Sequence, residues 1–211
     1  MIWTAVGFAV TYQIFLQIPA YTLYAVAPEL SQVWVMGLSY LSVGAMLFWF
    51  LDQEGVVREV AGLGDRNSTT TLATLVAVAA VYFLSTLVSD VLVATFGPEG
   101  LSISEDMQVI MRFSRPLELF FTVVLVAPLV EEFIYRGLLM GVLLERGWAP
   151  LAATGLSALI FSVQHFQYGW IGIVTVFMFA MLFGVLRVAT GGLYAPILAH
   201  VICNAVSVIY W

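Results

Sequence analysis

Several stretches of this chain run for about 20 residues with almost no charged side chain, and this feature restricts the fold more than any other. An α-helix of that length crosses the hydrocarbon core of a bilayer, and it satisfies its backbone N–H and C=O groups internally. Apolar residues make up 62% of the chain and charged residues 9%, against roughly half and a quarter in an ordinary soluble domain. The sequence therefore predicts an all-α fold, a polytopic bundle of transmembrane helices.

The apolar stretches predict about seven membrane-spanning helices, because each is long enough to cross most of a bilayer. Pro19 and Pro128 lie inside two of them, and a break at either proline would change the count by one helix. A polar segment rich in charge and glycine, 52–70, is predicted to be a loop. The predicted spans are 2–27, 33–51, 72–96, 117–144, 151–166, 170–186 and 193–211.

A short amphipathic helix is predicted between the third and fourth spans, over residues 101–115. Ile103, Met107 and Ile110 recur there at helical spacing, behind a capping pattern of serine and glutamate that begins at Ser102. Such a helix, with one narrow apolar face, is suited to lie on the membrane surface rather than to cross the bilayer.

The charge balance excludes several kinds of partner and site. The net charge is −6, with seven arginines and no lysine, so the chain has no polybasic patch for nucleic acid.

Cys203 is the single cysteine and cannot form an intramolecular disulfide. The first apolar stretch has no basic residue before it and is too long for a cleavable signal peptide, so we expect a retained helix. These features predict a multi-pass protein of the cell membrane, with the lipid bilayer as its surroundings.

The fourth predicted span carries Glu131, Glu132 and Arg136 deep in an apolar segment. An ionisable side chain at the bilayer centre costs on the order of 2.5 to 3.5 kcal/mol, so these groups need partners. Glu132 and Arg136 are one helical turn apart and can form an ion pair. Glu131 projects from a different face, where it could point into a cavity and act as a general base. A purely architectural network of buried charges is the alternative interpretation.

The two histidines, His165 and His200, also lie in apolar segments that are predicted to be helical. Phe161 is one turn before His165 and can wall its pocket, and Asn204 is one turn after His200 on the same helix face. Either histidine alone fits a hydrogen-bonded core residue. Polar groups from three spans are satisfied most easily around one polar intramembrane cavity, which is the arrangement of an active site.

The residue types in this cavity suit amide hydrolysis, which needs an activated water and hydrogen-bond donors for the oxyanion, worth roughly 3 to 4 kcal/mol per donor. Glu131 and His165 could take the water's proton, and His200 and Asn204 could donate to the oxyanion. The chain has no nucleophile elbow of the Gly-x-Ser-x-Gly type, and Cys203 lies on another face of its helix. The candidate site residues are Glu131, His165, His200 and Asn204 as catalytic groups, with Glu132, Arg136 and Phe161 in support.

All of these groups lie in residues 117–211, which we therefore predict to be the catalytic transmembrane core. Residues 1–116 would supply the N-terminal transmembrane helices, the loop and the surface helix. The two regions are predicted to form a single integral membrane domain.

Three patterns occur in order along the chain: Glu-Glu-x-x-x-Arg at 131–136, Phe-x-x-x-His at 161–165 and His-x-x-x-Asn at 200–204. Together they resemble the signature of the type II CAAX prenyl endopeptidase and bacteriocin-processing family (CPBP, Abi-like), over roughly residues 117–205. The resemblance implies a metal-independent, glutamate-type intramembrane endopeptidase without a cofactor. In that family the first glutamate and the first histidine hold the catalytic water, and the second histidine and the asparagine form the oxyanion hole. The implied substrate is a peptide or a prenylated protein.

Three other functions fit parts of the same pattern. Two histidines and a glutamate can hold a catalytic zinc ion, although the chain has no His-Glu-x-x-His helix, and sensitivity to a chelator would favour this alternative. A non-proteolytic membrane scaffold or immunity protein could use the polar cluster only to hold partners. A small transporter is the third alternative, because intramembrane acids also mark ion paths, but the chain has no duplicated half.

Overall fold

The computed structural model describes residues 2–210, and Met1 and Trp211, the outer limits of the two predicted regions, lie outside the described residues. The described residues form helices joined by turns, with no β-strand among them, which confirms the all-α prediction. The N-terminal elements are α1 (Ile2–Val26), α2 (Gln32–Gln53), α3 (Val57–Ala61), α4 (Ser68–Phe96), the 3₁₀ turn η1 (Pro98–Leu101) and α5 (Glu105–Phe113). The following elements are α6 (Pro116–Leu119), η2 (Phe120–Val126), α7 (Ala127–Glu132), η3 (Phe133–Leu139), α8 (Met140–Glu145), α9 (Pro150–Val163), η4 (Phe166–Tyr168), α10 (Gly169–Thr190) and α11 (Tyr194–Tyr210).

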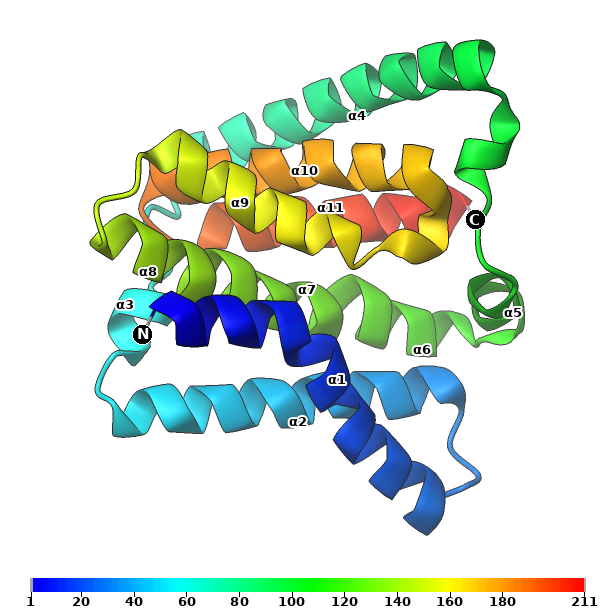
Figure 1. The fold of residues 1–211 in the computed structure, drawn as a ribbon, viewed down its shortest axis with the longest axis horizontal. Helices are drawn as coiled ribbons and strands as arrows, with labels where there is room; N and C mark the ends of the chain where they lie inside the picture. Colours follow the sequence, from blue (N-terminus) through cyan, green and yellow to red (C-terminus); the bar gives the residue numbers. More distant parts are fainter. Residues whose placement is uncertain (1, 211) are drawn as a thin grey trace.

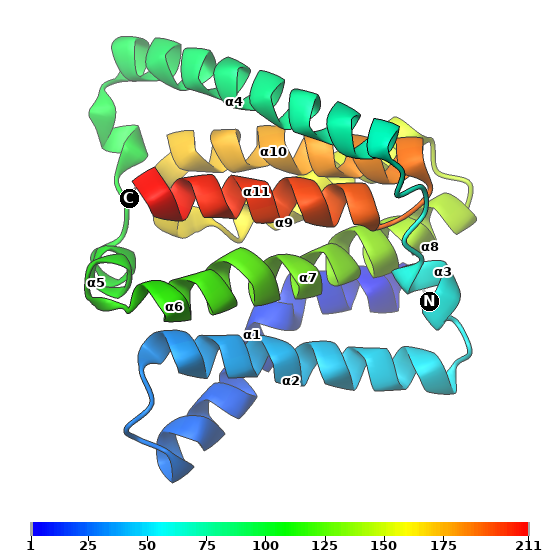
Figure 2. The same ribbon diagram turned by 180° about the vertical axis from the view of Figure 1, so that it is seen from behind.

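The long helices lie side by side in a bundle (Figure 1). α4 lies at one edge, in contact with α10 and α11, and α9 packs on α10. The run from α6 to α8 lies in the middle of the bundle, and α1 and α2 cover its other side (Figure 2). The middle run therefore has helices on both sides that can supply partners to its charged residues.

Among residues 2–210, three helical segments are long and apolar enough to cross a membrane: α2, α4 and the segment Phe166–Thr190, which joins η4 to α10. α9 and α11 are shorter apolar helices. Large apolar side chains of α4 are exposed, among them Leu72, Val76, Phe83 and Val91, and a continuous apolar surface of this kind is suited to contact lipid. These features are those of a membrane protein, and the count of seven spans remains a prediction.

Residues 116–145 form one continuous helical run, so the fourth predicted span is confirmed as a helix and Pro128 does not break it. Two parts of the run, η2 and η3, are π-helices, in which each hydrogen bond reaches one residue further than in an α-helix. The 6 residues of α7 lie between them and end in the two glutamates. The candidate base thus lies on a short α-helical segment with a π-helix on either side.

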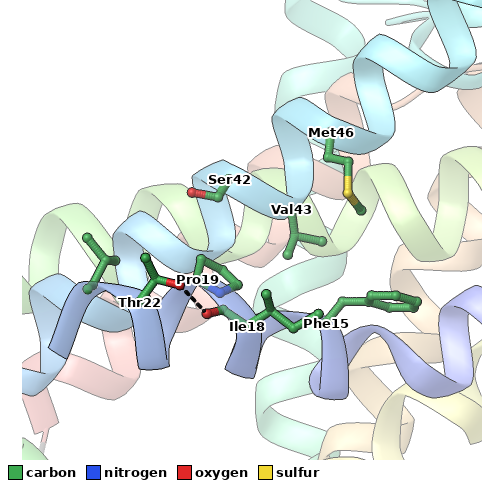
Figure 3. A pocket seen from close by; sticks show the side chains of 8 residues that line it. Phe15, Ile18, Pro19, Thr22, Ser42, Val43 and Met46 are labelled. Carbon is green, nitrogen blue, oxygen red and sulfur yellow. Dashed lines mark hydrogen bonds between the residues drawn. The ribbon is translucent and has the colours of Figure 1, made fainter. Parts of the chain in front are cut away.

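α1 continues through Pro19 as a helix, but its second half turns away from the bundle (Figures 1 and 2). Proline lacks the backbone N–H of a helical hydrogen bond and its ring crowds the preceding turn, which bends helices. Between this half and α2 lies a groove of about 370 Å³ (Figure 3). Its walls carry Phe15, Ile18, Pro19, Thr22 and Leu23 from α1 and Ser42, Val43 and Met46 from α2.

The boundaries around the fifth and sixth predicted spans differ from the prediction. α9 ends at Val163 instead of 166, so His165 lies in the turn after the helix and not inside it. The turn ends at Gly169, whose φ of 69° suits glycine, and α10 begins there. α10 then extends to Thr190, beyond the predicted limit of 186.

The predicted amphipathic helix is present but shorter, and runs from Glu105 to Phe113 as α5. Ser104 caps it, because its Oγ accepts a hydrogen bond from the Met107 N–H at 3.4 Å. Residues 98–101, before this cap, form the separate turn η1. Phe113 is 75% exposed, and the position of this helix on the membrane surface remains a prediction.

Candidate active site

The charged groups of α7 and η3 form a buried cluster with His200 from α11. Arg136 Nη1 donates to Glu132 Oε1 at 2.9 Å, which confirms the predicted ion pair. The Nδ1 of His200 lies 2.8 Å from the same oxygen. An ionised carboxylate only accepts hydrogen bonds, so His200 Nδ1 carries the proton in this contact. Glu132 and Arg136 are fully buried, and His200 is 4% exposed.

Arg136 has charged, hydrogen-bonding and aromatic partners, which compensate for the cost of burying its guanidinium inside the bundle. Its Nη2 donates to the Ala180 carbonyl of α10 at 2.9 Å. The ring centroids of Phe161 and Phe183 lie 4.9 Å and 5.2 Å from its Cζ, within the range of cation–π contacts. Groups on α9 and α10 therefore fix the charged cluster in place.

His200 contacts both glutamates, although these project from different faces of their helix. Its Nε2 lies 3.7 Å from Glu131 Oε2, while its Nδ1 contacts Glu132. An imidazole has nitrogen atoms on two edges, so two glutamates about 100° apart on their helix can both reach it. The His200 ring is stacked on the Phe183 ring, with the centroids 4.7 Å apart, which fixes its plane.

Glu131 is also held by two tyrosines that the motifs did not indicate. The hydroxyl groups of Tyr12 in α1 and Tyr40 in α2 donate to Glu131 Oε1 at 3.2 Å and 2.7 Å. The signal in the sequence is the polar pair Tyr12 and Gln13 inside an apolar span, because a buried phenol needs a hydrogen-bond partner. The Glu131 carboxylate therefore lies between α1, α2 and α11, and the residue is 4% exposed.

His165 joins the cluster through an aromatic contact. Its Nδ1 lies 2.8 Å from the Phe161 carbonyl, so Nδ1 donates and Nε2 is the acceptor nitrogen of the neutral ring. The Phe161 ring centroid lies 4.5 Å from that of His165 and 5.6 Å from that of His200. Phe161 thus stands between the two histidines, and within residues 2–210 no direct hydrogen bond joins His165 to Glu131.

Asn204 lies one turn after His200 on α11, but its hydrogen bond goes to a different element. Its Nδ2 donates to the Val123 carbonyl of η2 at 2.8 Å. The usual helical donors for that carbonyl are used or missing, because the Ala127 N–H bonds to the Thr122 carbonyl and Pro128 has no N–H. A side-chain amide carries two N–H groups, and this hydrogen bond uses one of them.

We expect Asn204→Ala to lower the free energy of unfolding by about 1–3 kcal/mol, because the Val123 carbonyl loses its partner. The loss is expected to be smaller in a Pro128→Ala background, where residue 128 regains an N–H that can reach the same carbonyl. Thermal unfolding of the wild type, both single variants and the double variant in detergent, followed by circular dichroism, measures this coupling. Equal losses in both backgrounds would mean that the Asn204 hydrogen bond does not serve the Val123 carbonyl in this way.

Cys203 lies in a separate apolar cluster with Val78 of α4 and Ala195 of α11, which agrees with its predicted place on another face. In the part of the chain that the structure describes, no group of three or more His, Cys, Asp and Glu side chains is arranged to hold a metal ion. The site is thus a cluster of two carboxylates and two imidazoles, completed by phenol, guanidinium and amide groups.

Comparison with known proteins finds relatives for this part of the chain. Residues 113–206 match the family model described as type II CAAX prenyl endopeptidase Rce1-like, and this range contains all three motifs. A protein of Staphylococcus aureus (strain USA300), named Membrane-embedded CAAX protease MroQ, is 30% identical over 141 residues, which cover 64% of this chain and 56% of that protein. An Uncharacterized 24.3 kDa protein of Escherichia coli is 28% identical over 91 residues, 42% of each chain. No solved structure matches the chain.

The chain spans about half the length of the relatives it matches. The longer alignment, with the Staphylococcus aureus protein, covers more residues than the family model does. The matches agree with the resemblance that the three motifs indicate. Residues 113–206 are therefore similar to the family of type II CAAX prenyl endopeptidase Rce1-like proteins.

Proposed function

We propose that this protein is a CAAX-protease-like endopeptidase of the membrane, which hydrolyses peptide bonds with a water activated by Glu131 and His165. The observation that carries the proposal is the buried Glu131 carboxylate, whose Oε2 faces His200 Nε2 at 3.7 Å. This distance is longer than a direct hydrogen bond, so Oε2 is not saturated by a structural partner. A carboxylate oxygen in this condition can accept a proton from water, which is the task of a general base.

In the proposed reaction, Glu131 Oε2 takes a proton from a water molecule while the water oxygen bonds to the substrate carbonyl carbon. The acceptor nitrogen of His165 orients the same water. In the proposal the oxyanion accepts hydrogen bonds from His200 Nε2 and from the second N–H of Asn204, worth roughly 3 to 4 kcal/mol each. Glu131 then gives the proton to the amine nitrogen as the carbon–nitrogen bond breaks.

The supporting residues hold these groups at the required positions. Glu132 Oε1 accepts from both Arg136 and His200, so Glu132 orients the His200 ring. Within the described residues its Oε2 is buried and has no hydrogen-bond partner. Phe161 separates the two histidines and packs on the Arg136 guanidinium. In this proposal the Phe161 ring and the Glu132–Arg136 ion pair hold the two histidines in the positions that the reaction requires.

The substrate class is proposed from the relatives. The Staphylococcus aureus protein is named a CAAX protease, and the family model is that of a CAAX prenyl endopeptidase. We therefore propose that the substrate is a peptide or protein with a prenylated CAAX-type C-terminus, which reaches the site within the cell membrane. The protein itself would be a multi-pass protein of that membrane.

Cleavage by the purified full chain in liposomes tests this function, with a farnesylated CAAX-type peptide and its unprenylated twin as substrates. We expect mass spectrometry to find cleavage of the farnesylated peptide that a chelator does not reduce, because the proposed base and donors are side chains. Loss of activity with a chelator and its recovery with zinc would replace this proposal by a zinc-dependent protease. A folded chain that cuts neither peptide would favour the scaffold or immunity function.

A further inference from the structure

Two buried tyrosines from outside residues 113–206 contact the proposed base. Tyr12 in α1 is fully buried and Tyr40 in α2 is 7% exposed, and both donate to Glu131 Oε1. We propose that Tyr12 and Tyr40 are positioning residues, which hold Glu131 through its Oε1 and leave its second oxygen for the reaction. This inference rests on the proposed function, and it makes the α1–α2 hairpin part of the active site.

The direction of the Tyr12 hydroxyl is fixed by a second polar group. Gln13 Nε2 donates to the Tyr12 hydroxyl oxygen at 2.7 Å, so the proton of that hydroxyl is free to be donated to Glu131. The Tyr12 ring meets the Tyr135 ring edge-on, with the centroids 5.6 Å apart and the planes at 86°. Packing and hydrogen bonding therefore fix Tyr12 without a contribution from substrate.

Because both tyrosine hydroxyl groups bind one oxygen of the Glu131 carboxylate, its two oxygen atoms have different roles. A carboxylate oxygen has about two acceptor positions, and Tyr12 and Tyr40 fill both on Oε1. Oε2 then remains for the water, on the side that faces His200.

The charged groups near Glu131 bond to atoms other than its Oε1. Arg136 and His200 Nδ1 donate to Glu132, and His165 Nδ1 donates to the Phe161 carbonyl. Removing the two hydroxyl groups therefore takes two donors from Oε1 and, at Tyr12, the acceptor of Gln13 Nε2. The charged and titratable groups around Glu131 are Tyr12 of α1, Tyr40 of α2, Glu132, Tyr135 and Arg136 of its own run, His165 after α9, Tyr168 of η4 and His200 of α11.

Tyr12→Phe and Tyr40→Phe remove the hydroxyl groups and keep the rings. We expect kcat/KM of the purified full chain to fall about tenfold for each variant and about a hundredfold for the double variant, mainly through kcat, because each variant loses a hydrogen bond to a charged group. A loss in kcat with KM unchanged is the signature of positioning the base, which weaker substrate binding would not give. Tyr82→Phe is the control, because its hydroxyl donates to the Cys203 carbonyl and should leave kcat and KM unchanged.

The infrared band of the Glu131 carboxylate, read from the difference between the wild type and Glu131→Gln, makes part of the test independent of cleavage. We expect this band to shift in the double tyrosine variant. An unshifted band, or a double variant with the wild-type kcat/KM, overturns the positioning role and leaves the endopeptidase proposal intact. A wild-type chain that cuts no peptide overturns the proposed function, and with it the role of the two tyrosines in catalysis. The infrared band would then report only whether the two hydroxyl groups donate to Glu131.

Discussion

The Glu131→Gln variant is expected to keep its fold and to lose cleavage activity, with kcat/KM lower by about 10²–10⁴-fold, the usual contribution of a general base. Glutamine has the length of glutamate, and its carbonyl oxygen can still accept hydrogen bonds from Tyr12 and Tyr40. A neutral amide, however, does not take a proton from water. Steady-state kinetics on the purified protein measure the loss, and the thermal unfolding midpoint establishes that the protein is folded.

Glu145→Gln is the matched control for this variant. Glu145 ends the same helical run, at α8, but its side chain is exposed and away from the cluster. The control variant is expected to cleave at the wild-type rate. If Glu131→Gln keeps more than about a tenth of the wild-type rate, the loss is too small for a general base, and another group, with His165 the first candidate, must activate the water.

Replacing Arg136 with methionine is expected to destabilise the fold strongly, by about 3–5 kcal/mol in the free energy of unfolding. The substitution leaves the Glu132 carboxylate without its ion-pair partner in an apolar interior. It also removes the hydrogen bond to the Ala180 carbonyl and the contact with the Phe161 ring. The yield of folded protein from membranes and the thermal midpoint in detergent measure the effect.

A double variant, Glu132→Gln with Arg136→Met, shows how much of the lost stability comes from the unpaired Glu132 carboxylate and how much from the lost contacts of Arg136. An amide at position 132 can still accept from His200 Nδ1 and carries no charge, so the double variant is expected to recover part of the stability. A double variant as unstable as Arg136→Met alone would mean that the Ala180 and ring contacts, rather than the carboxylate, account for the loss.

The charged half of the site could be predicted because charge is rare in this chain. Glu131, Glu132 and Arg136 stand out in an apolar segment, and the spacing of Glu132 and Arg136 predicts the ion pair that the structure confirms at 2.9 Å. This prediction depends only on the geometry of one helical turn. The catalytic roles of Glu131, His165, His200 and Asn204 remain predictions, because position alone does not measure reactivity.

The partners from distant parts of the chain could not be predicted in the same way. Tyr12 and Tyr40 are 119 and 91 residues from Glu131 in the sequence, and no helical spacing rule connects them to it. The chain has nine tyrosines, and tyrosine is common at membrane interfaces, so a tyrosine in an apolar span does not by itself indicate a site. The Asn204 bond to Val123 depends on a π-helix, which the usual spacing rules assume to be absent.

Because π-helices lie on both sides of α7, the direction in which its side chains point depends on the type of helix as well as on the number of residues. Each π turn takes in one residue more than an α turn. An ordinary α-helix with the same number of residues over 120–126 would therefore rotate the glutamates by about 100°, away from Tyr40 and His200. A related chain with all three motifs but an α-helix at this place would need one residue fewer to keep its glutamates in position. Recognising active members of such a family therefore requires counting the residues between α6 and α7 as well as reading the motifs.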